Sequence, residues 1–264
     1  MSKSPVIILT GASRGLGLAV LQLLLSNHNA RVTTLSRSIS SELQAVVKQY
    51  GQDRVLPIQG DVGRSEDNIR VVEETVKKWG EIDGLILNAG TIEPKKLDSV
   101  PIDSLASYVQ TNLLSTIYLV QPALPHLRKT KGKVVLISSG ASTTGYQAWG
   151  LYSMAKAGMN SLARTLAAEE KENEVAVFAI RPGMVNVSPH RYITVYRHDP
   201  LLRNEGPATM HPDEMVKFQN AHKNGELLAP EQPGSVIAGL AIDGSLELTG
   251  EYINWADDRL KSFQ

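Results

Sequence analysis

Short apolar runs alternate along the chain with longer segments in which apolar positions recur at helical spacing. Most of the short runs are continuously apolar, which is typical of strands buried on both faces of a parallel sheet. Seven such runs are expected to be strands: Val6–Thr10, Arg31–Ser36, Val55–Gln59, Leu85–Asn88, Lys133–Ser138, Val175–Arg181 and Glu251–Trp255. Helices are expected between them, at Gly15–Asn27, Ser41–Tyr50, Glu66–Trp79, Ile102–Arg128, Tyr152–Glu172 and Glu231–Ile242.

This alternation predicts an α/β fold with one doubly wound parallel sheet, helices on both of its faces and right-handed crossovers. No change of composition marks a second domain, so residues 1–264 are expected to form a single domain. Residues 186–228 interrupt this alternation of strand and helix patterns. They contain four of the six histidines and few apolar runs. We interpret this insertion after the sixth strand as a lid over the substrate, because ligands bind beyond the carboxyl ends of such strands. An ordinary surface excursion is the alternative.

Composition excludes several classes of protein. The 27 basic and 27 acidic residues balance, which gives no electrostatic basis for binding nucleic acid or an anionic membrane. The absence of cysteine excludes disulfides and a thiol nucleophile, and it fits a reducing compartment. No apolar stretch has the length of a membrane span or signal-peptide core, so a cytoplasmic protein is expected. The histidines form no metal-ligand motif, and no metal site is expected.

A glycine-rich turn, TGASRGLG, lies between the first expected strand and the first expected helix. That context turns a glycine pattern into a candidate dinucleotide site. Gly11 would allow the tight turn, Gly15 the approach of the backbone to a pyrophosphate, and Gly17 close packing of helix on sheet. The helix N-terminus adds free N–H groups and partial positive charge. The residues expected to contact the cofactor here are Gly11, Ser13, Arg14, Gly15, Leu16 and Gly17.

The second expected strand indicates which dinucleotide is bound. An enzyme that uses NAD places an acid near the end of this strand to hold the ribose 2′-hydroxyl. No Asp or Glu precedes Glu42, and Arg37 stands where that acid would be, directly after Ser36. Guanidinium groups match phosphate oxygens, and Arg14 supplies a second one. The sequence therefore predicts that the protein binds NADP(H). The alternative is that both arginines are solvated surface charges that bind no phosphate.

Two more turns follow expected strands. Asp61 and Val62 come after the third strand, where the carboxylate is placed to bind an adenine amino group or, alternatively, to cap the next helix. Asn88, Ala89 and Gly90 follow the fourth strand, where small residues would let the backbone pass beside the adenosine ribose.

Ser139, Tyr152 and Lys156 are the candidate catalytic residues. Tyrosine and lysine at i and i+4 share one helix face, with Cβ atoms roughly 5–6 Å apart. An ammonium that close favours the phenolate and lowers a tyrosine pKa that starts near ~10. Ser139, after a buried strand, adds a hydroxyl. The three suit proton transfer at a carbonyl or carbinol oxygen; the alternative, a solvated helix face, is disfavoured by the glycine-rich turn.

Three other residues near this trio have open interpretations. Asn112 lies among aliphatic residues of the long fourth helix, where it would bend the helix and hold a water behind Lys156, or simply be a satisfied helix asparagine. Tyr146 and Trp149, just before Tyr152, would line an apolar substrate pocket or serve as packing residues.

The turn after the sixth strand reads RPGMV. It resembles a turn that brackets a nicotinamide, with Pro182 and Gly183 shaping the chain and the backbone of Val185 left for the carboxamide.

TGxxxGxG, NAG, the helix asparagine, the serine–tyrosine–lysine spacing and PG occur in one order between Val6 and about Trp255. In that order they resemble the classical short-chain dehydrogenase/reductase family. The resemblance implies one Rossmann domain whose seven-stranded sheet has the order 3-2-1-4-5-6-7. It implies Tyr152 as acid and base, Ser139 as carbonyl polariser, and Lys156 as the group that lowers the Tyr152 pKa and grips the nicotinamide ribose. Asn112 would hold a water.

Within the family, the segments AWGLY, Glu169–Glu170 and GEYINW are similar to fungal benzil-reductase and sepiapterin-reductase-like carbonyl reductases. One departure concerns the cofactor: Val187 stands where the family often has a threonine that contacts the carboxamide, with Ser188 next. Either Ser188 replaces that threonine or the nicotinamide is anchored more loosely at Val187.

The expected activity is NADPH-dependent reduction of a small ketone, diketone or aldehyde. The alternatives are an NADP-binding sensor without turnover, an alcohol dehydrogenase working oxidatively, and an enoyl reductase, which would need a differently spaced tyrosine. The two long helices are candidates for the interface of a homodimer or homotetramer.

Overall fold

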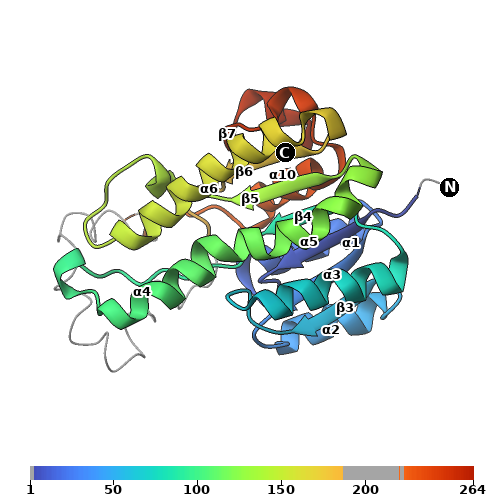
Figure 1. Ribbon diagram of the computed structural model, residues 1–264, viewed down its shortest axis with the longest axis horizontal. Helices are drawn as coiled ribbons and strands as arrows, with labels where there is room; N and C mark the ends of the chain where they lie inside the picture. Colours follow the sequence, from blue (N-terminus) through green and yellow to red (C-terminus); the bar gives the residue numbers. More distant parts are fainter. Residues whose placement is uncertain (1–2, 187–219, 221–222) are drawn as a thin grey trace.

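The computed structural model describes residues 3–186, 220 and 223–264. Its centre is one sheet of seven parallel strands in the order β3-β2-β1-β4-β5-β6-β7, which confirms the predicted topology (Figure 1). The strands are β1 Val6–Thr10, β2 Arg31–Ser36, β3 Val55–Gln59, β4 Gly84–Leu87, β5 Lys133–Ile137, β6 Ala176–Arg181 and β7 Tyr252–Asn254. The fourth strand ends before Asn88 because that residue leaves the sheet to bond with Thr10.

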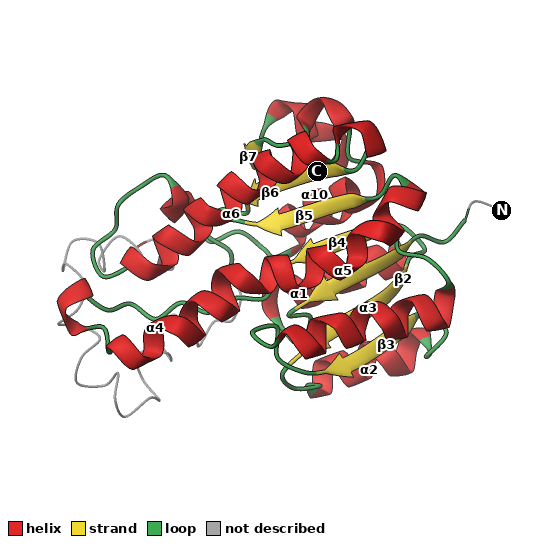
Figure 2. Ribbon diagram, in the orientation of Figure 1, coloured by secondary structure: helices red, strands yellow, loops and turns green. Residues whose placement is uncertain are grey.

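Helices cover both faces of the sheet (Figure 2). Helices α1, α2 and α10 pack on one face, and helices α3, α5 and α6 on the other. The α-helices of the described residues are α1 Gly15–Ser26, α2 Ser41–Tyr50, α3 Ser65–Trp79, α4 Ile102–Val109, α5 Ser115–Thr130, α6 Gly150–Glu169 and α10 Glu231–Asp243. Within the described residues, every helix is too short or too polar to cross a lipid bilayer.

Two expected helices differ from the structure by more than one residue. The segment Ile102–Arg128 is helical throughout and continues to Thr130, but a π-helical turn, Gln110–Leu114, interrupts its α-helical hydrogen bonding between α4 and α5. The expected helix Tyr152–Glu172 begins earlier, at Gly150, and ends at Glu169. Tyr152 therefore lies in the first turn of α6.

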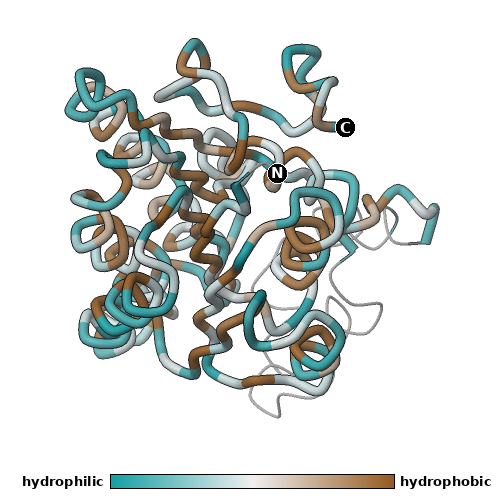
Figure 3. Tube along the Cα trace, turned by 90° about the vertical axis from the view of Figure 1, so that its right-hand side faces the viewer, coloured by the Kyte–Doolittle hydropathy of each residue, from teal (hydrophilic) through white to brown (hydrophobic). Residues whose placement is uncertain are grey.

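The core consists of two layers, one on each side of the strands. All five residues of β1 are buried, which agrees with its continuously apolar pattern. Ile7 and Leu9 belong to the layer under α1 and α10, and Ile8 to the layer under α3, α5 and α6. Figure 3 shows hydrophobic positions along the central strands and hydrophilic ones on the outer surfaces. Alternate strand residues therefore face opposite helix layers.

The carboxyl ends of the strands meet at one edge of the sheet, where the arrowheads in Figure 2 point toward α4 and the start of α6. The candidate turns after β1, β2, β4, β5 and β6 all lie at this edge. Most of the expected lid, including Val187 and Ser188, lies outside the described residues. Its two described ends pair: Asn186 N donates to Leu228 O at 2.8 Å and Leu228 N to Met184 O at 2.9 Å.

Candidate active site

Backbone geometry explains the glycines of the first turn. Gly11 and Gly15 have φ values of +74° and +56°, in the left-handed region that side chains disfavour. A Cβ on Gly17 would lie 2.3 Å from the Gly11 carbonyl oxygen, so only glycine fits at this approach of helix to turn. The turn therefore exposes backbone at the N-terminus of α1, as an anion site requires.

Asn88 braces this turn from the neighbouring strand. Its Nδ2 donates to the carbonyl oxygens of Thr10 at 3.0 Å and Gly11 at 3.2 Å. In return, the Thr10 hydroxyl oxygen accepts from the N–H groups of Asn88 and Ala89, at 3.1 and 3.0 Å. A Cβ on Gly11 would lie 2.9 Å from Asn88 Nδ2, so the two turns pack without a gap.

The end of β2 leaves a buried hydroxyl unused. Ser36 is 7% exposed, and its Oγ has no hydrogen-bond partner among the described residues. Arg37, the next residue, is exposed, and its carbonyl oxygen accepts from Gln59 Nε2 at 3.1 Å. Ser40 Oγ donates to Ser13 O at 2.6 Å, which ties the glycine-rich turn to this segment. A hydroxyl that lacks a protein partner, next in sequence to an exposed arginine, fits a phosphate.

Asp61 does not cap the helix that follows it. Its Oδ1 accepts from Gly63 N at 2.8 Å within its own turn, while α3 begins at Ser65 after the extended residue Arg64. The cap interpretation is therefore wrong. Val62 is 7% exposed and belongs to the core layer under α3.

Ser139 is placed with its proton available. It follows β5, and its Oγ accepts from Ala141 N at 3.2 Å at the start of a 3₁₀ turn, Gly140–Ser142. A hydroxyl that accepts an N–H keeps its own O–H to donate. Its backbone carbonyl oxygen is held separately, as Tyr252 donates to it at 2.9 Å.

Lys156 is buried beneath the tyrosine ring. Its Nζ lies 5.6 Å from the ring centroid of Tyr152 and donates to the Ile137 carbonyl oxygen at 2.6 Å. The side chain is 4% exposed, and this loss of hydration lowers the pKa of Lys156 from 10.5 to about 8. The structure therefore brings the predicted pair together and leaves the lysine mostly protonated at neutral pH.

Aromatic rings border Tyr152 on one side. Trp149 meets Tyr152 edge-on, with ring centroids 5.7 Å apart and planes at 87°, and Tyr146 lies 5.3 Å from Trp149. Such edge contacts are favourable for aromatic rings. Ala148 has a φ of +68°, a strained value for a residue with a side chain, and directly precedes Trp149.

Asn112 spans from the π-helical turn to the loop after β4. Its Oδ1 accepts from Thr91 N at 2.8 Å, and its Nδ2 donates to Tyr108 O at 3.1 Å and Thr91 Oγ1 at 3.2 Å. A Cβ on Gly90 would lie 3.1 Å from Asn112 Oδ1 and 3.8 Å from Lys156 Nζ. Gly90 thus lies beside both the amide oxygen and the ammonium, and Oδ1 has a second lone pair besides the one that accepts from Thr91 N.

The turn after β6 is packed tightly. Gly183 has a φ of +78°, and a Cβ there would lie 2.7 Å from Leu228 Cδ1 and 3.2 Å from Trp255 Nε1. Val185 and Leu228 form a parallel bridge. Its hydrogen bonds join the N–H and C=O of Leu228 to Met184 O and Asn186 N, on either side of Val185. In such a bridge the N–H and C=O of Val185 itself point the other way.

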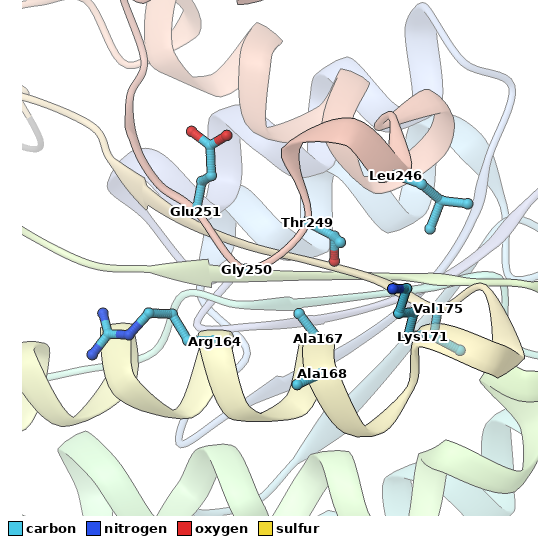
Figure 4. A pocket seen from close by; sticks show the side chains of 9 residues that line it. All are labelled: Arg164, Ala167, Ala168, Lys171, Val175, Leu246, Thr249, Gly250 and Glu251. Atoms are coloured by element: carbon cyan, nitrogen blue, oxygen red, sulfur yellow. The ribbon is translucent and has the colours of Figure 1, made fainter.

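A concavity of about 590 Å³ lies elsewhere, between the C-terminal half of α6 and the loop before β7 (Figure 4). Arg164, one of its lining residues, is twelve positions beyond Tyr152 on the helix, roughly 18 Å along its axis. Figure 4 shows the Glu251 carboxylate turned away from α6, and this group pairs with Arg259 at 2.9 Å. This concavity is therefore separate from the candidate catalytic residues.

Some side chains that hold the site have weak or no signals in the sequence. Tyr108 precedes Asn112 by four residues, a helical spacing that predicts proximity. Thr10, Asn160 and Tyr252 bond to site residues or their neighbours across long separations, which no local pattern reveals.

Comparisons with known proteins agree with this geometry. The short chain dehydrogenase family profile matches residues 5–194. An uncharacterized oxidoreductase of Schizosaccharomyces pombe is 34% identical over 95% of this chain and 96% of its own length. A benzil reductase ((S)-benzoin forming) of Saccharomyces cerevisiae is 31% identical over 98% of both chains. A crystal structure of a Saccharomyces cerevisiae short chain dehydrogenase/reductase superposes with a TM-score of 0.89, 32% identity, and coverage of 99% of this chain and 100% of that one.

The chain therefore belongs to the short-chain dehydrogenase family, whose members are oxidoreductases that use nicotinamide cofactors. The predicted fold and family are both confirmed.

Proposed function

We propose that this protein is an NADPH-dependent carbonyl reductase that acts on a prochiral ketone, diketone or aldehyde. The observation that carries the proposal is the buried Lys156 ammonium, 5.6 Å from the Tyr152 ring centroid, at the edge of the sheet where Ser139 also lies. A phenol supported by a lysine is a proton donor, and Ser139 adds a hydroxyl with its own proton available.

The cofactor, when bound, supplies a hydride to the carbonyl carbon. Tyr152 donates its proton to the carbonyl oxygen as negative charge develops there, and Ser139 hydrogen-bonds the same oxygen. General acid help of this kind is worth roughly 10²–10⁴-fold in rate. Lys156 keeps a positive charge near the phenol, and Asn112 supports a water between its Oδ1 and Lys156, in the space beside Gly90.

The cofactor's phosphates would lie on the turn Gly11–Gly17, where backbone N–H groups open onto the edge of the sheet. Ser36, Arg37 and Arg14 would hold a 2′-phosphate, and the unused Ser36 hydroxyl supports this choice. Asp61 and Val62 would border the adenine, and Asn88 to Gly90 its ribose. The outward N–H and C=O of Val185, bracketed by Pro182 and Gly183, would receive the carboxamide.

The substrate class follows from the rings beside Tyr152. Trp149 and Tyr146 form an aromatic border next to the proton donor, which suits flat, apolar carbonyl compounds. Relatives from Saccharomyces cerevisiae and Bacillus cereus carry the name benzil reductase ((S)-benzoin forming), which supports aryl α-diketones as substrates.

The test is NADPH oxidation by the purified chain with a panel of ketones and α-diketones, benzil included, with the alcohol product analysed by chiral chromatography. We expect turnover, fastest with aryl diketones. An absence of turnover across the panel, with tight NADPH binding retained, would favour the sensor alternative.

We also propose a cytoplasmic protein that forms a homodimer or homotetramer. The absence of cysteine supports a reducing compartment. Ile117 on α5 and Met154 on α6 are 43% and 49% exposed, which supports these two helices as the subunit interface. Light scattering of the wild type and of Ile117→Glu would test this proposal.

A further inference from the structure

A chain of polar side chains runs from the core to the backbone of Ser139. Ser138 Oγ donates to Asn160 Oδ1 at 2.6 Å, and Asn160 Nδ2 donates to Ser142 Oγ at 2.8 Å. Ser142 Oγ then donates to the carbonyl oxygen of Ser139 at 2.6 Å. The three bonds run in one direction, so each polarises the next. Ser138 and Asn160 are 2% and 5% exposed, which places the start of this chain in the core.

A second element reaches the same oxygen atom. Tyr252, on β7, donates its hydroxyl proton to Ser139 O at 2.9 Å, across 113 positions of sequence. The backbone N–H of Ser142 also points there, at 3.0 Å. A carbonyl oxygen has two lone pairs, yet three donors converge on this one. The peptide group after Ser139 is therefore fixed from both the 3₁₀ turn Gly140–Ser142 and β7.

This fixation holds the backbone from which the Ser139 side chain projects. Rotation of the peptide group would break the bonds from Ser142 and Tyr252 together, and the Oγ is already tied to Ala141 N at 3.2 Å. A hydrogen-bonding group acts on a transition state only if it is held at the right place beforehand. Neither Ser142 nor Tyr252 needs to touch a substrate to exert this effect.

We propose that Ser142 and Tyr252 are positioning residues that aim the Ser139 hydroxyl at the reacting oxygen, with Asn160 fixing the direction of the Ser142 hydroxyl. The inference rests on the proposed reductase function, because it gives Ser139 its role there. It adds residues from the start of β7, from the 3₁₀ turn after β5 and from the middle of α6 to the machinery of the site.

Two substitutions remove one donor each without changing charge: Ser142→Ala and Tyr252→Phe. Each should lower kcat roughly 3–10-fold, the effect of one hydrogen bond, and leave the Kd for NADPH within about twofold. Thr143→Ala is the matched control, because it removes an exposed hydroxyl of the same turn that donates to Gly140 O at 3.3 Å. It should leave kcat unchanged.

A double-mutant cycle separates positioning from general disruption. If the two residues act through Ser139, each substitution should lower kcat less than about twofold once Ser139→Ala is already present. The same loss in both backgrounds would overturn the proposal, as would an unchanged kcat in the wild-type background.

Amide hydrogen exchange tests the positioning without any turnover. The backbone amides of residues 139–142 should exchange several-fold faster in Ser142→Ala and Tyr252→Phe than in wild type or Thr143→Ala. If the wild type had no reductase activity and the two variants still exchanged faster than it, the proposed reductase function would fail. The claim that Ser142 and Tyr252 fix this backbone would then still hold. Unchanged exchange would overturn the positioning claim.

Discussion

Burying the charged side chain of Lys156 costs free energy. Lys156 is 4% exposed and donates to the Ile137 carbonyl oxygen, and burial lowers its pKa to about 8. A pKa of about 8 against 10.5 in the unfolded chain means that the charged form costs about 3 kcal/mol in the fold at neutral pH. The protein retains this charge because the proposed chemistry needs an ammonium beside Tyr152.

The cost of that charge predicts how stability depends on pH. Between about pH 8 and 10.5 the unfolded state binds more protons at Lys156, so its contribution to the free energy of unfolding rises with pH. Lys156→Met should be more stable than wild type at pH 7, and its advantage should shrink as the pH rises toward 10. Urea unfolding of both proteins over this range gives the difference. An advantage that did not change with pH would contradict the burial of a charged lysine.

Arg37 should determine the choice between the two dinucleotides. Arg37→Asp replaces the proposed phosphate partner with an acid that repels phosphate and can accept from a ribose hydroxyl. The ratio of kcat/KM for NADPH to that for NADH should fall at least about tenfold. Arg164→Asp, a charge reversal at an exposed arginine of α6 that lines the separate concavity, is the control. Initial rates with both cofactors measure the ratio, and an unchanged ratio would leave the cofactor prediction without a basis.

At the residue scale, the sequence was informative where chemistry depends on local spacing. The tyrosine and lysine of α6 are four residues apart, so helix geometry alone places them together, as the structure confirms. The roles of Gly11 and Gly17 in the turn were equally predictable, since only glycine tolerates those conformations and contacts. The bonds that Tyr252 and Asn88 make to distant backbone atoms depend on strand order, which spacing does not encode.

Among the helices, α5 and α6 are joined at their C-terminal ends by a buried carboxylate. Glu170 is 1% exposed and receives two bonds from Arg128, at 2.7 and 2.9 Å, and one from Asn173 at 2.9 Å. These partners lower the pKa of Glu170, with the Arg128 hydrogen bond as the largest cause. The pair fixes the C-terminal ends of α5, which follows the π-helical turn that contains Asn112, and of α6, which carries Tyr152 in its first turn.

Glu170→Gln should therefore lower the free energy of unfolding by roughly 1–3 kcal/mol at pH 7. The lowered pKa means that wild type has this stabilisation above about pH 4.5 and loses it as the pH falls through the folded-state pKa. The difference between the two proteins should shrink in acid. Glu169→Gln, at the exposed neighbour, is the control for denaturant unfolding, and an equal effect of both substitutions would argue against the buried pair.

The sequence predicted the helical segments but not the π-helical turn between α4 and α5. Hydrophobic periodicity continues through residues 102–128, so the pattern reads as one helix. The π-helical turn arises where Asn112 bonds to Tyr108 O and to the loop after β4, a tertiary contact that periodicity does not contain. The π-helical turn thus coincides with the point where Asn112 contacts the loop after β4.

For the whole molecule, the order of the strands was the strongest prediction. Apolar runs separated by helices specify a parallel sheet, and the family resemblance supplied the order that the structure has. Core layers on both faces of one sheet support our proposal that residues 1–264 form one domain. The substrate was not predictable, because the proposed border of the pocket consists of Tyr146, Trp149 and the expected lid, whose sequences follow no general code.

The most direct test of the proposed function is Tyr152→Phe, which removes one hydroxyl and leaves the ring contacts with Trp149 and Lys156 in place. NADPH binding, measured by nucleotide fluorescence, should stay within about twofold of wild type, since the phenol's main role is proton transfer. Turnover of an accepted diketone should fall roughly 10²–10⁴-fold. Tyr50→Phe, at the end of α2, is the control and should keep full activity. Retention of wild-type turnover by Tyr152→Phe would contradict the account.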